Sequence, residues 1–99
     1  MLNSIVSAIR SRHVLTFTYE GVQRTVEPHA VGISKIDGND VMRCYQTGGE
    51  NTHQGEEWLL CELVKIKNLA DTGTSFSGPR PGYKKGDNDM KRAYIYAEL

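Results

Sequence analysis

The sequence predicts a mainly β domain with one N-terminal helix, an α+β fold built as a small, strongly bent barrel that the helix closes at one end. Three observations support this class. A helical stripe of apolar residues comes first, several short segments of alternating apolar and polar residues follow it, and ten glycines supply turns. A chain of 99 residues suits one modest core, so we treat residues 1–99 as a single domain.

Residues 1–12 are predicted to form the helix. Its apolar face follows the i, i+3, i+4, i+7 spacing of an amphipathic helix, through Leu2, Ile5, Val6 and Ile9. Arg10 and Arg12 lie in the last turn, where cations interact favourably with the helix dipole. We therefore expect the helix to end near His13.

Residues 13–70 are predicted to supply the strands of the barrel. Apolar and polar side chains alternate over residues 14–20, and Gly21 begins a tight turn into a second strand over residues 22–28. Pro28 is expected to end that strand, because proline has no N–H to donate to a sheet ladder.

Three further segments complete the predicted barrel. A third strand over residues 30–36 leads into a hairpin turn at Asp37-Gly38-Asn39, and residues 41–46 form a fourth strand. A fifth, longer strand is expected over residues 58–69, whose apolar residues fall on both faces as in a strongly bent strand. Between them, residues 48–55 are predicted to form a polar, mobile loop.

Residues 71–92 are predicted to form an irregular loop rich in Gly and Pro, followed by an edge strand over residues 93–99. Residues 79–92 of the loop carry the local basic bias of the chain, because Asp87 and Asp89 are outnumbered there by Arg80, Lys84, Lys85, Lys91 and Arg92. Two interpretations stay open. The loop is either a solvated connection across the barrel or a flap that binds an anion.

Charge and hydropathy exclude several classes of protein. Twelve Lys and Arg residues balance twelve Asp and Glu residues, which excludes a globally basic nucleic-acid binder but leaves room for a local basic patch. No apolar stretch approaches the ~20 residues that span a bilayer. The N-terminus also lacks the apolar core of a signal peptide. We therefore expect a cytoplasmic protein with no membrane partner.

No group of residues indicates catalysis, a metal site or a cofactor. Cys44 and Cys61 lie inside predicted strands without the strand–turn–helix elbow of a nucleophile, and we expect two reduced, buried thiols. Together with His53 they lack the short paired spacings of a zinc site. The sequence predicts a protein that is not an enzyme and needs no cofactor.

His29 is the most informative of the three histidines. It follows Glu27 and Pro28 at an expected strand boundary, where a polar side chain can face a cleft. It either locks the turn through a hydrogen bond or donates a hydrogen bond to a ligand.

Arg43 and Tyr45 share one face of the fourth predicted strand with Val41, and Met42 and Cys44 take the core side. An Arg beside a Tyr can hold a phosphate and stack on a base. The alternative is that Arg43 pairs with Glu62 on the neighbouring strand, an interaction worth little when exposed.

The segment RSRHVLTFTYEGVQRTVEPHAVGISKIDGNDVMRCYQ, followed by WLLCELVKIKNL, resembles the WYL domain of bacterial and phage transcription regulators. The shared order is a short helix ending in basic residues, an x-F-x-Y strand and an R-x-V-E-P-H-x-x-G motif, over about residues 5–70. RTVEPHAVGI is the specific part. Asp40-Val41-Met42 stands where the family has Trp-Tyr-Leu, and Glu62 replaces an arginine that the family tends to use toward anionic ligands.

The resemblance implies an Sm-like, SH3-type small barrel that senses a ligand, often a nucleic acid or a nucleotide. Its ligand face would include His29 and Tyr45. In the family this domain usually follows a DNA-binding helix-turn-helix domain. The chain begins at the domain's own helix, so we expect a stand-alone copy that acts through a partner, sequesters a ligand or regulates another protein.

The sequence supports two functions. The first is a non-enzymatic regulatory domain that binds a nucleotide-like or single-stranded nucleic-acid ligand through Arg24, His29, Arg43, Tyr45, Arg80, Tyr83 and Lys84. Its Arg and Lys side chains would contact phosphate, its Tyr rings would stack on bases, and His29 would donate a hydrogen bond. The alternative is a protein-interaction module that forms a homo-oligomer or docks on a partner protein through the edge strand over residues 93–99. The zero net charge and Glu62 favour that alternative.

Overall fold

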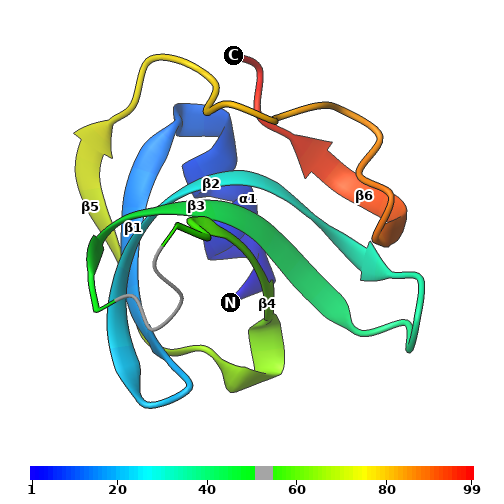
Figure 1. The fold of residues 1–99 in the computed structure, drawn as a ribbon, viewed down its shortest axis with the longest axis horizontal. Coiled ribbons are helices and arrows are strands. Elements are labelled where there is room, and N and C mark those ends of the chain that lie inside the picture. Colours follow the sequence, from blue (N-terminus) through cyan, green and yellow to red (C-terminus); the bar gives the residue numbers. More distant parts are fainter. Residues whose placement is uncertain (51–54) are drawn as a thin grey trace.

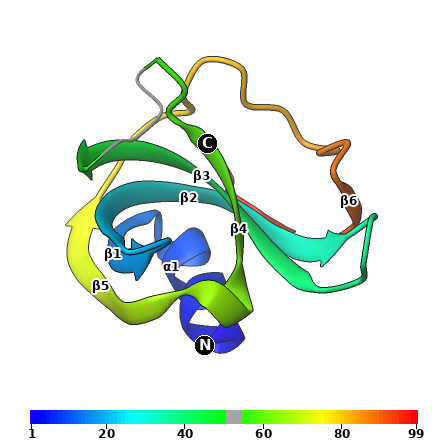
Figure 2. The ribbon, with the colours of Figure 1, turned by 60° about the horizontal axis from the view of Figure 1, so that its bottom comes forward.

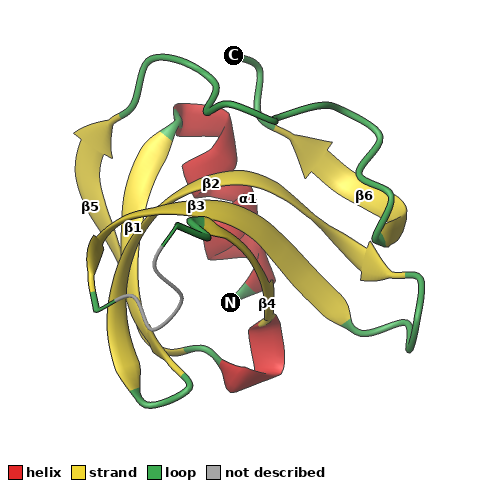
Figure 3. Cartoon of the chain, in the orientation of Figure 1, coloured by secondary structure: helices red, strands yellow, loops and turns green. Residues whose placement is uncertain are grey.

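A computed structural model describes residues 1–50 and 55–99. It confirms a mainly β chain with one N-terminal helix, and Figure 3 shows the helix against a curved sheet. The elements in chain order are α1 (Leu2–Ser11), β1 (His13–Tyr19), β2 (Val22–Ser34), β3 (Asp40–Gly49), β4 (Trp58–Glu62), the short 3₁₀ helix η1 (Leu63–Lys65), β5 (Lys67–Ser75) and β6 (Met90–Tyr96).

The strands form one antiparallel sheet in the order β4-β3-β2-β1-β5, and β6 pairs with β2 outside this path. Figures 1 and 2 show the sheet curling around α1. Within the described strands no pairing joins β4 to β5, so the sheet is open. The curvature brings β5, at one end of the strand order, against the helix and leaves a convex outer face.

β2 organises the sheet, because it pairs with three other strands. Its first half pairs with β1, its second half pairs with β6, and β3 lies along nearly its whole length. The prediction of two strands separated at Pro28 is therefore wrong. Pro28 lies opposite Cys44, at the point where the pairing partner of β2 changes from β1 to β6. The register of β2 against β3 also shifts between Pro28 and Ala30. A residue without an N–H is tolerated at such an irregular point.

The turn at Asp37-Gly38-Asn39 is confirmed as the β2–β3 connection. The Ser34 N–H donates to the Asn39 carbonyl at 2.8 Å, and the Gly38 N–H donates to the Ser34 carbonyl at 3.0 Å. The Asp37 carboxylate accepts from the Asn39 N–H at 3.0 Å, as in an Asx turn. Residues 51–54 of the predicted polar loop lie outside the described residues.

The prediction of one long strand over residues 58–69 is wrong. The chain forms β4, turns through η1 and continues as β5, which lies at the opposite end of the sheet order. Leu63 and Ile66 are buried at i, i+3 spacing, while Val64 between them is 81% exposed. The apolar residues on both faces of this segment therefore reflect a helical turn and not a bent strand.

The main core lies between α1 and the concave face of the sheet. The predicted apolar stripe is confirmed, since Ile5 and Ile9 are fully buried and Leu2 and Val6 pack against the core. Cys44 and Cys61 are buried free thiols, as expected. A smaller cluster of Ala30, Val41 and Met90 lies under β6.

The last quarter of the chain is more regular than predicted. Residues 71–75 belong to β5, and β6 begins at Met90, three residues before the predicted strand. The intervening β5–β6 connection, residues 76–89, contains no helix or strand. No described helix combines the length and apolarity needed to cross a bilayer.

Candidate functional site

The candidate site lies on the outer face of the sheet, under the β5–β6 connection. Arg43 and Tyr45 point to this face, and Met42 and Cys44 are buried on the core side, as their alternation predicts. A pocket of about 320 Å³ opens between the sheet and the connection. Its walls are formed by Ala30, Arg43, Trp58, Pro81, Gly82, Tyr83, Lys84, Asp87, Asn88 and Asp89.

His29 holds the connection against the sheet and is fully buried. Its Nδ1 lies 2.8 Å from the Glu27 carbonyl oxygen, and the Arg80 N–H donates to its Nε2 at 3.4 Å. Because a carbonyl oxygen only accepts, the proton sits on Nδ1 and the ring is neutral. Burial lowers the pKa of His29, and the nearby Arg80 charge acts in the same direction.

Three aromatic rings surround His29. Phe76 stacks on the imidazole with centroids 5.5 Å apart, and Trp58 and Tyr83 approach it edge-on at 4.9 and 4.8 Å. Both ring nitrogens of His29 are occupied and no part of the ring reaches solvent. The prediction that His29 donates to a ligand is therefore wrong, and the alternative of a hydrogen-bonded structural histidine is confirmed. It joins β2 to the β5–β6 connection.

Arg80 also serves to hold the connection. Its Nε and Nη2 donate to the two carboxylate oxygens of Glu27 at 2.7 and 3.0 Å, and its guanidinium lies 4.9 Å from the ring centroid of Tyr45. The hydrogen bonds that Arg80 donates to Glu27 raise the pKa of Arg80. Tyr45 in turn meets Trp58 edge-on at 5.2 Å. Arg80 and Tyr45, both predicted to contact a ligand, are engaged with each other beside the pocket.

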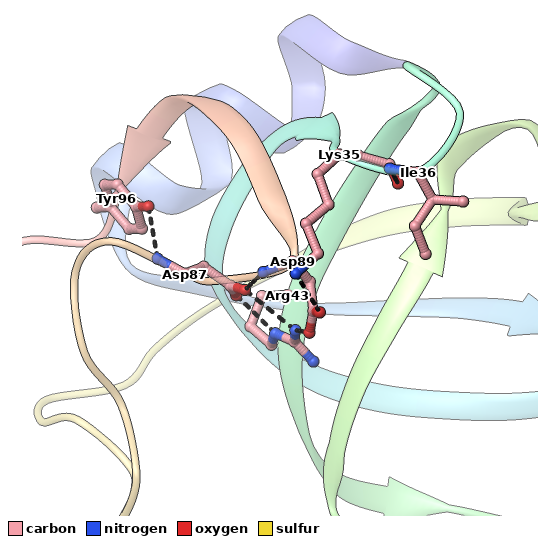
Figure 4. A network of polar contacts seen from close by, with 7 residues as sticks. Lys35, Ile36, Arg43, Asp87, Asp89 and Tyr96 are labelled. Carbon is pink, nitrogen blue, oxygen red and sulfur yellow. Dashed lines mark hydrogen bonds and ion pairs between the residues drawn. The ribbon is translucent and has the colours of Figure 1, made fainter.

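Arg43 forms the polar side of the pocket. Its Nε and Nη2 donate to Asp87 at 2.7 and 3.2 Å, and Nη2 also donates to Asp89 at 2.6 Å (Figure 4). The expected pairing with Glu62 is wrong, because Arg43 lies opposite Leu60 and Glu62 pairs with Lys65.

These contacts also set the ionisation of the pair. Burial opposes ionisation of Asp87, but hydrogen bonds from Arg43 and from the Asp89 N–H outweigh it and lower the pKa of the carboxyl. Burial likewise opposes the charge of Arg43, and its bonds to Asp87 and Asp89 outweigh that effect and raise its pKa. Both groups are therefore charged at neutral pH.

Trp58 and Tyr83 form the aromatic side of the pocket. The indole N–H of Trp58 donates to the Pro81 carbonyl at 2.7 Å, and the Tyr83 hydroxyl donates to the Ala97 carbonyl at 2.8 Å. Gly82 has a φ of 91°, and a Cβ there would stand 3.3 Å from the Trp58 ring nitrogen. A glycine is therefore needed for the connection to pack this closely.

Arg24 does not belong to this site. It lies with Val26 and Gln46 on the core side of the sheet, and only 1% of its surface is exposed. Its Nη1 donates to Gln46 Oε1 at 3.0 Å and its Nε donates to the Tyr19 carbonyl at 3.3 Å. The prediction of a ligand-contacting Arg24 is wrong, because Arg24 shares a strand face with Val26 and that face packs against the core.

Of the predicted site residues, Arg43, Tyr83 and Lys84 line the pocket, and Tyr45 and Arg80 lie behind its aromatic wall. Sequence reasoning missed Trp58 as a wall and Asp87 and Asp89 as partners of Arg43. The signals were a single tryptophan at the start of a strand and a pair of acidic residues inside a basic segment.

No metal site is found in the described ranges 1–50 and 55–99, because no three His, Cys, Asp or Glu side chains there lie close enough together to hold a metal ion. His53 lies outside these ranges. Family models, curated proteins and solved structures were all compared with the chain, and none matches it.

Proposed function

We propose that the protein is a non-enzymatic, ligand-binding regulatory domain that binds a nucleotide-like ligand in the pocket under the β5–β6 connection. The observation that carries this proposal is the pairing of aromatic walls with cations in one pocket. Trp58 and Tyr83 lie on one side, and Arg43 and Lys84 are the two cations of the lining. A base stacks on aromatic rings, and its phosphate binds Arg and Lys.

The size and polarity of the pocket agree with a ligand of this kind. About 320 Å³ is near the lower end of small-molecule pockets, so the pocket suits one nucleotide unit and not a folded nucleic acid. The polar groups of Trp58 and Tyr83 are already hydrogen-bonded to backbone carbonyls. A ligand can therefore stack on these rings without having to supply a hydrogen-bond acceptor for them.

We further propose that the fold is an incompletely closed form of the Sm-like, SH3-type small barrel, as in WYL domains. The support is the bent antiparallel sheet around one N-terminal helix, together with the RTVEPHAVGI motif. In this chain that motif supplies Glu27 and His29, which hold the β5–β6 connection in place. The specific part of the resemblance thus contributes to the pocket by positioning its outer wall.

Trp58 makes this proposal directly testable, because it is the single tryptophan of the chain and lines the pocket. We would titrate nucleoside 5′-monophosphates, cyclic dinucleotides and short single-stranded DNA and RNA while exciting the indole selectively. The expected result is a saturable change in Trp58 fluorescence that weakens with salt. Thermal shift should show a matching rise in Tm, by mass action.

A matched pair of variants locates the binding site. Lys84 lines the pocket, whereas Lys67 is exposed on β5. Lys84→Gln should weaken binding of phosphate-bearing ligands about threefold to tenfold, and Lys67→Gln should leave it unchanged. Equal effects of both variants, or no fluorescence change with any of the titrated ligands, would contradict the nucleotide proposal.

The alternative proposal is a protein-interaction module, and β6 is the observation that favours it. Among the described strands β6 pairs with β2 alone, so its other edge is open to a further strand. The ring of Tyr94, also on β6, is half exposed. A concentration-dependent molar mass in light scattering that Tyr94→Lys abolishes would support this function. A constant monomer mass would remove self-association from it.

A further inference from the structure

We propose that Arg43 is the phosphate subsite of the pocket and that Asp89 occupies this subsite as an internal competitor, which a bound phosphate displaces. This inference rests on the proposed function and names the position of the phosphate within it. The two carboxylates that contact Arg43 in Figure 4 differ in their exposure and in the number of hydrogen bonds that they accept from it.

Asp87 is the fixed partner of Arg43. Its side chain is 11% exposed and takes two hydrogen bonds from the guanidinium, and it also accepts from the Asp89 N–H at 2.9 Å. Its own N–H donates to the Tyr96 hydroxyl at 2.9 Å. Removing this carboxylate would leave a half-buried guanidinium without its partner, so Asp87 stays in place when a ligand binds.

Asp89 is the exchangeable partner. Its side chain is 50% exposed and its carboxylate takes a single hydrogen bond from Arg43, at Nη2. Lys35 Nζ lies 4.0 Å from Asp89 Oδ1, so a displaced Asp89 still has a cation beside it. An ion pair this exposed contributes little stability, and its loss costs the fold little.

The guanidinium also keeps unused donors. Nε and Nη2 make all the hydrogen bonds of the Arg43 side chain to described residues, which leaves the two N–H groups of Nη1 for a ligand. Figure 4 shows Nη1 outside the contacts with both carboxylates. A phosphate at Nη1 and Nη2 makes a two-point contact with Arg43, whereas Asp89 makes one. Lys84, on the same pocket, adds a second positive charge.

Asp89→Asn tests this assignment, with Asp71→Asn as its control. The amide is isosteric with the carboxylate, and the backbone bond from the Lys35 N–H to the Asp89 carbonyl does not involve the side chain. Asp71 lies on β5, where it pairs with His13, so Asp71→Asn makes the same charge change away from the pocket. The probes are inorganic phosphate, the four ribonucleosides and their 5′-monophosphates.

Two readouts separate the subsite from the aromatic wall. Trp58 fluorescence follows the base, and the ¹⁵Nε–¹H resonance of Arg43 follows the anion, since the hydrogen bond to Asp87 protects that proton from exchange. Asp89→Asn should tighten monophosphate binding about threefold to tenfold and leave nucleoside binding unchanged. Inorganic phosphate should shift the Arg43 resonance at lower concentration in this variant. Asp71→Asn should behave as wild type.

The outcomes distinguish this inference from the proposed function. Monophosphates that bind no better than nucleosides, with no effect of Asp89→Asn and an unmoved Arg43 resonance, would overturn the subsite and leave a nucleoside pocket. A phosphate-dependent Arg43 resonance that responds to Asp89→Asn, with no effect of any nucleoside or nucleotide on Trp58, would support the subsite and overturn the nucleotide function. If no probe changes either the Trp58 fluorescence or the Arg43 resonance, both the phosphate subsite and the nucleotide function are overturned.

Discussion

The Arg80 N–H donates a hydrogen bond to Nε2 of His29 at 3.4 Å, and this contact joins the centre of the sheet to a connection 51 residues further along the chain. It requires a neutral imidazole, because a protonated Nε2 has no lone pair to accept with. The outer wall of the pocket therefore depends on the ionisation state of one buried histidine.

Stability should fall as the pH drops below about 6.5. The pKa of His29 is lowered in the folded chain, chiefly by burial, so the unfolded chain binds the proton more tightly. The stabilisation is complete above the unfolded pKa and is lost as the pH falls toward the folded pKa. Urea unfolding between pH 8 and pH 5 measures this loss.

His13 supplies the control for the pH dependence. It is half-buried and pairs with Asp71, and it is not one of the rings that contact His29. His13→Gln should retain the part of the dependence that comes from His29, and His29→Gln should remove it. If His29→Gln does not fold, an NMR titration of the His29 ring in the wild-type protein should give a pKa below the ordinary histidine value of about 6.5. A pKa above that value would contradict the prediction.

Arg24 should matter for folding and not for binding. Arg24→Ala removes a buried guanidinium and leaves Gln46 Oε1 and the Tyr19 carbonyl without that donor, which should lower the free energy of unfolding by about 2–4 kcal/mol. Arg92→Ala, on the exposed face of β6, should change it by less than about 0.5 kcal/mol. Chemical denaturation measures both. If an Arg24→Ala protein that is shown to be folded loses ligand binding, Arg24 contributes to the binding site and the prediction is contradicted.

Gly32 should be intolerant of any side chain. A Cβ at Gly32 would stand 2.3 Å from the Arg92 carbonyl oxygen and 2.7 Å from Cα of Ala93, so β2 and β6 could not keep their pairing. Gly32→Ala should destabilise the fold by about 1–3 kcal/mol. Gly78→Ala is the matched control, because a Cβ there meets nothing within 4 Å. Equal melting temperatures for the two variants would show that β6 does not pack as described.

The two cysteines should be unreactive in the folded protein. Both are fully buried, and the pKa of Cys44 is raised by its hydrogen bond with Cys61 and by burial. A thiol held in its protonated form is a poor nucleophile. Ellman's reagent at pH 8 should titrate neither thiol until the chain is unfolded, whereas the thiol introduced by Ser7→Cys on the exposed side of α1 should react at once. Rapid modification of the native wild-type protein would contradict the packing of β3 on β4.

Local patterns predicted those parts of the fold in which one face of an element meets the core. The spacing of apolar residues predicted α1, and alternation placed Met42 and Cys44 inside and Arg43 outside. These predictions succeed because the periods of helix and strand are properties of the backbone itself. The β2–β3 turn was equally local, since Asp37 and Gly38 carry its chemistry.

Tertiary structure decided the rest, because it depends on which distant segments meet. Pro28 ends no strand, since β2 changes partners there. Arg24 is buried because Gln46 and Tyr19 supply its acceptors. Arg43 finds Asp87 and Asp89 more than 40 residues further along the chain. By itself the sequence determined which residues alternate and which faces are apolar, and long-range pairing decided which polar groups neutralise one another and which remain available to a ligand.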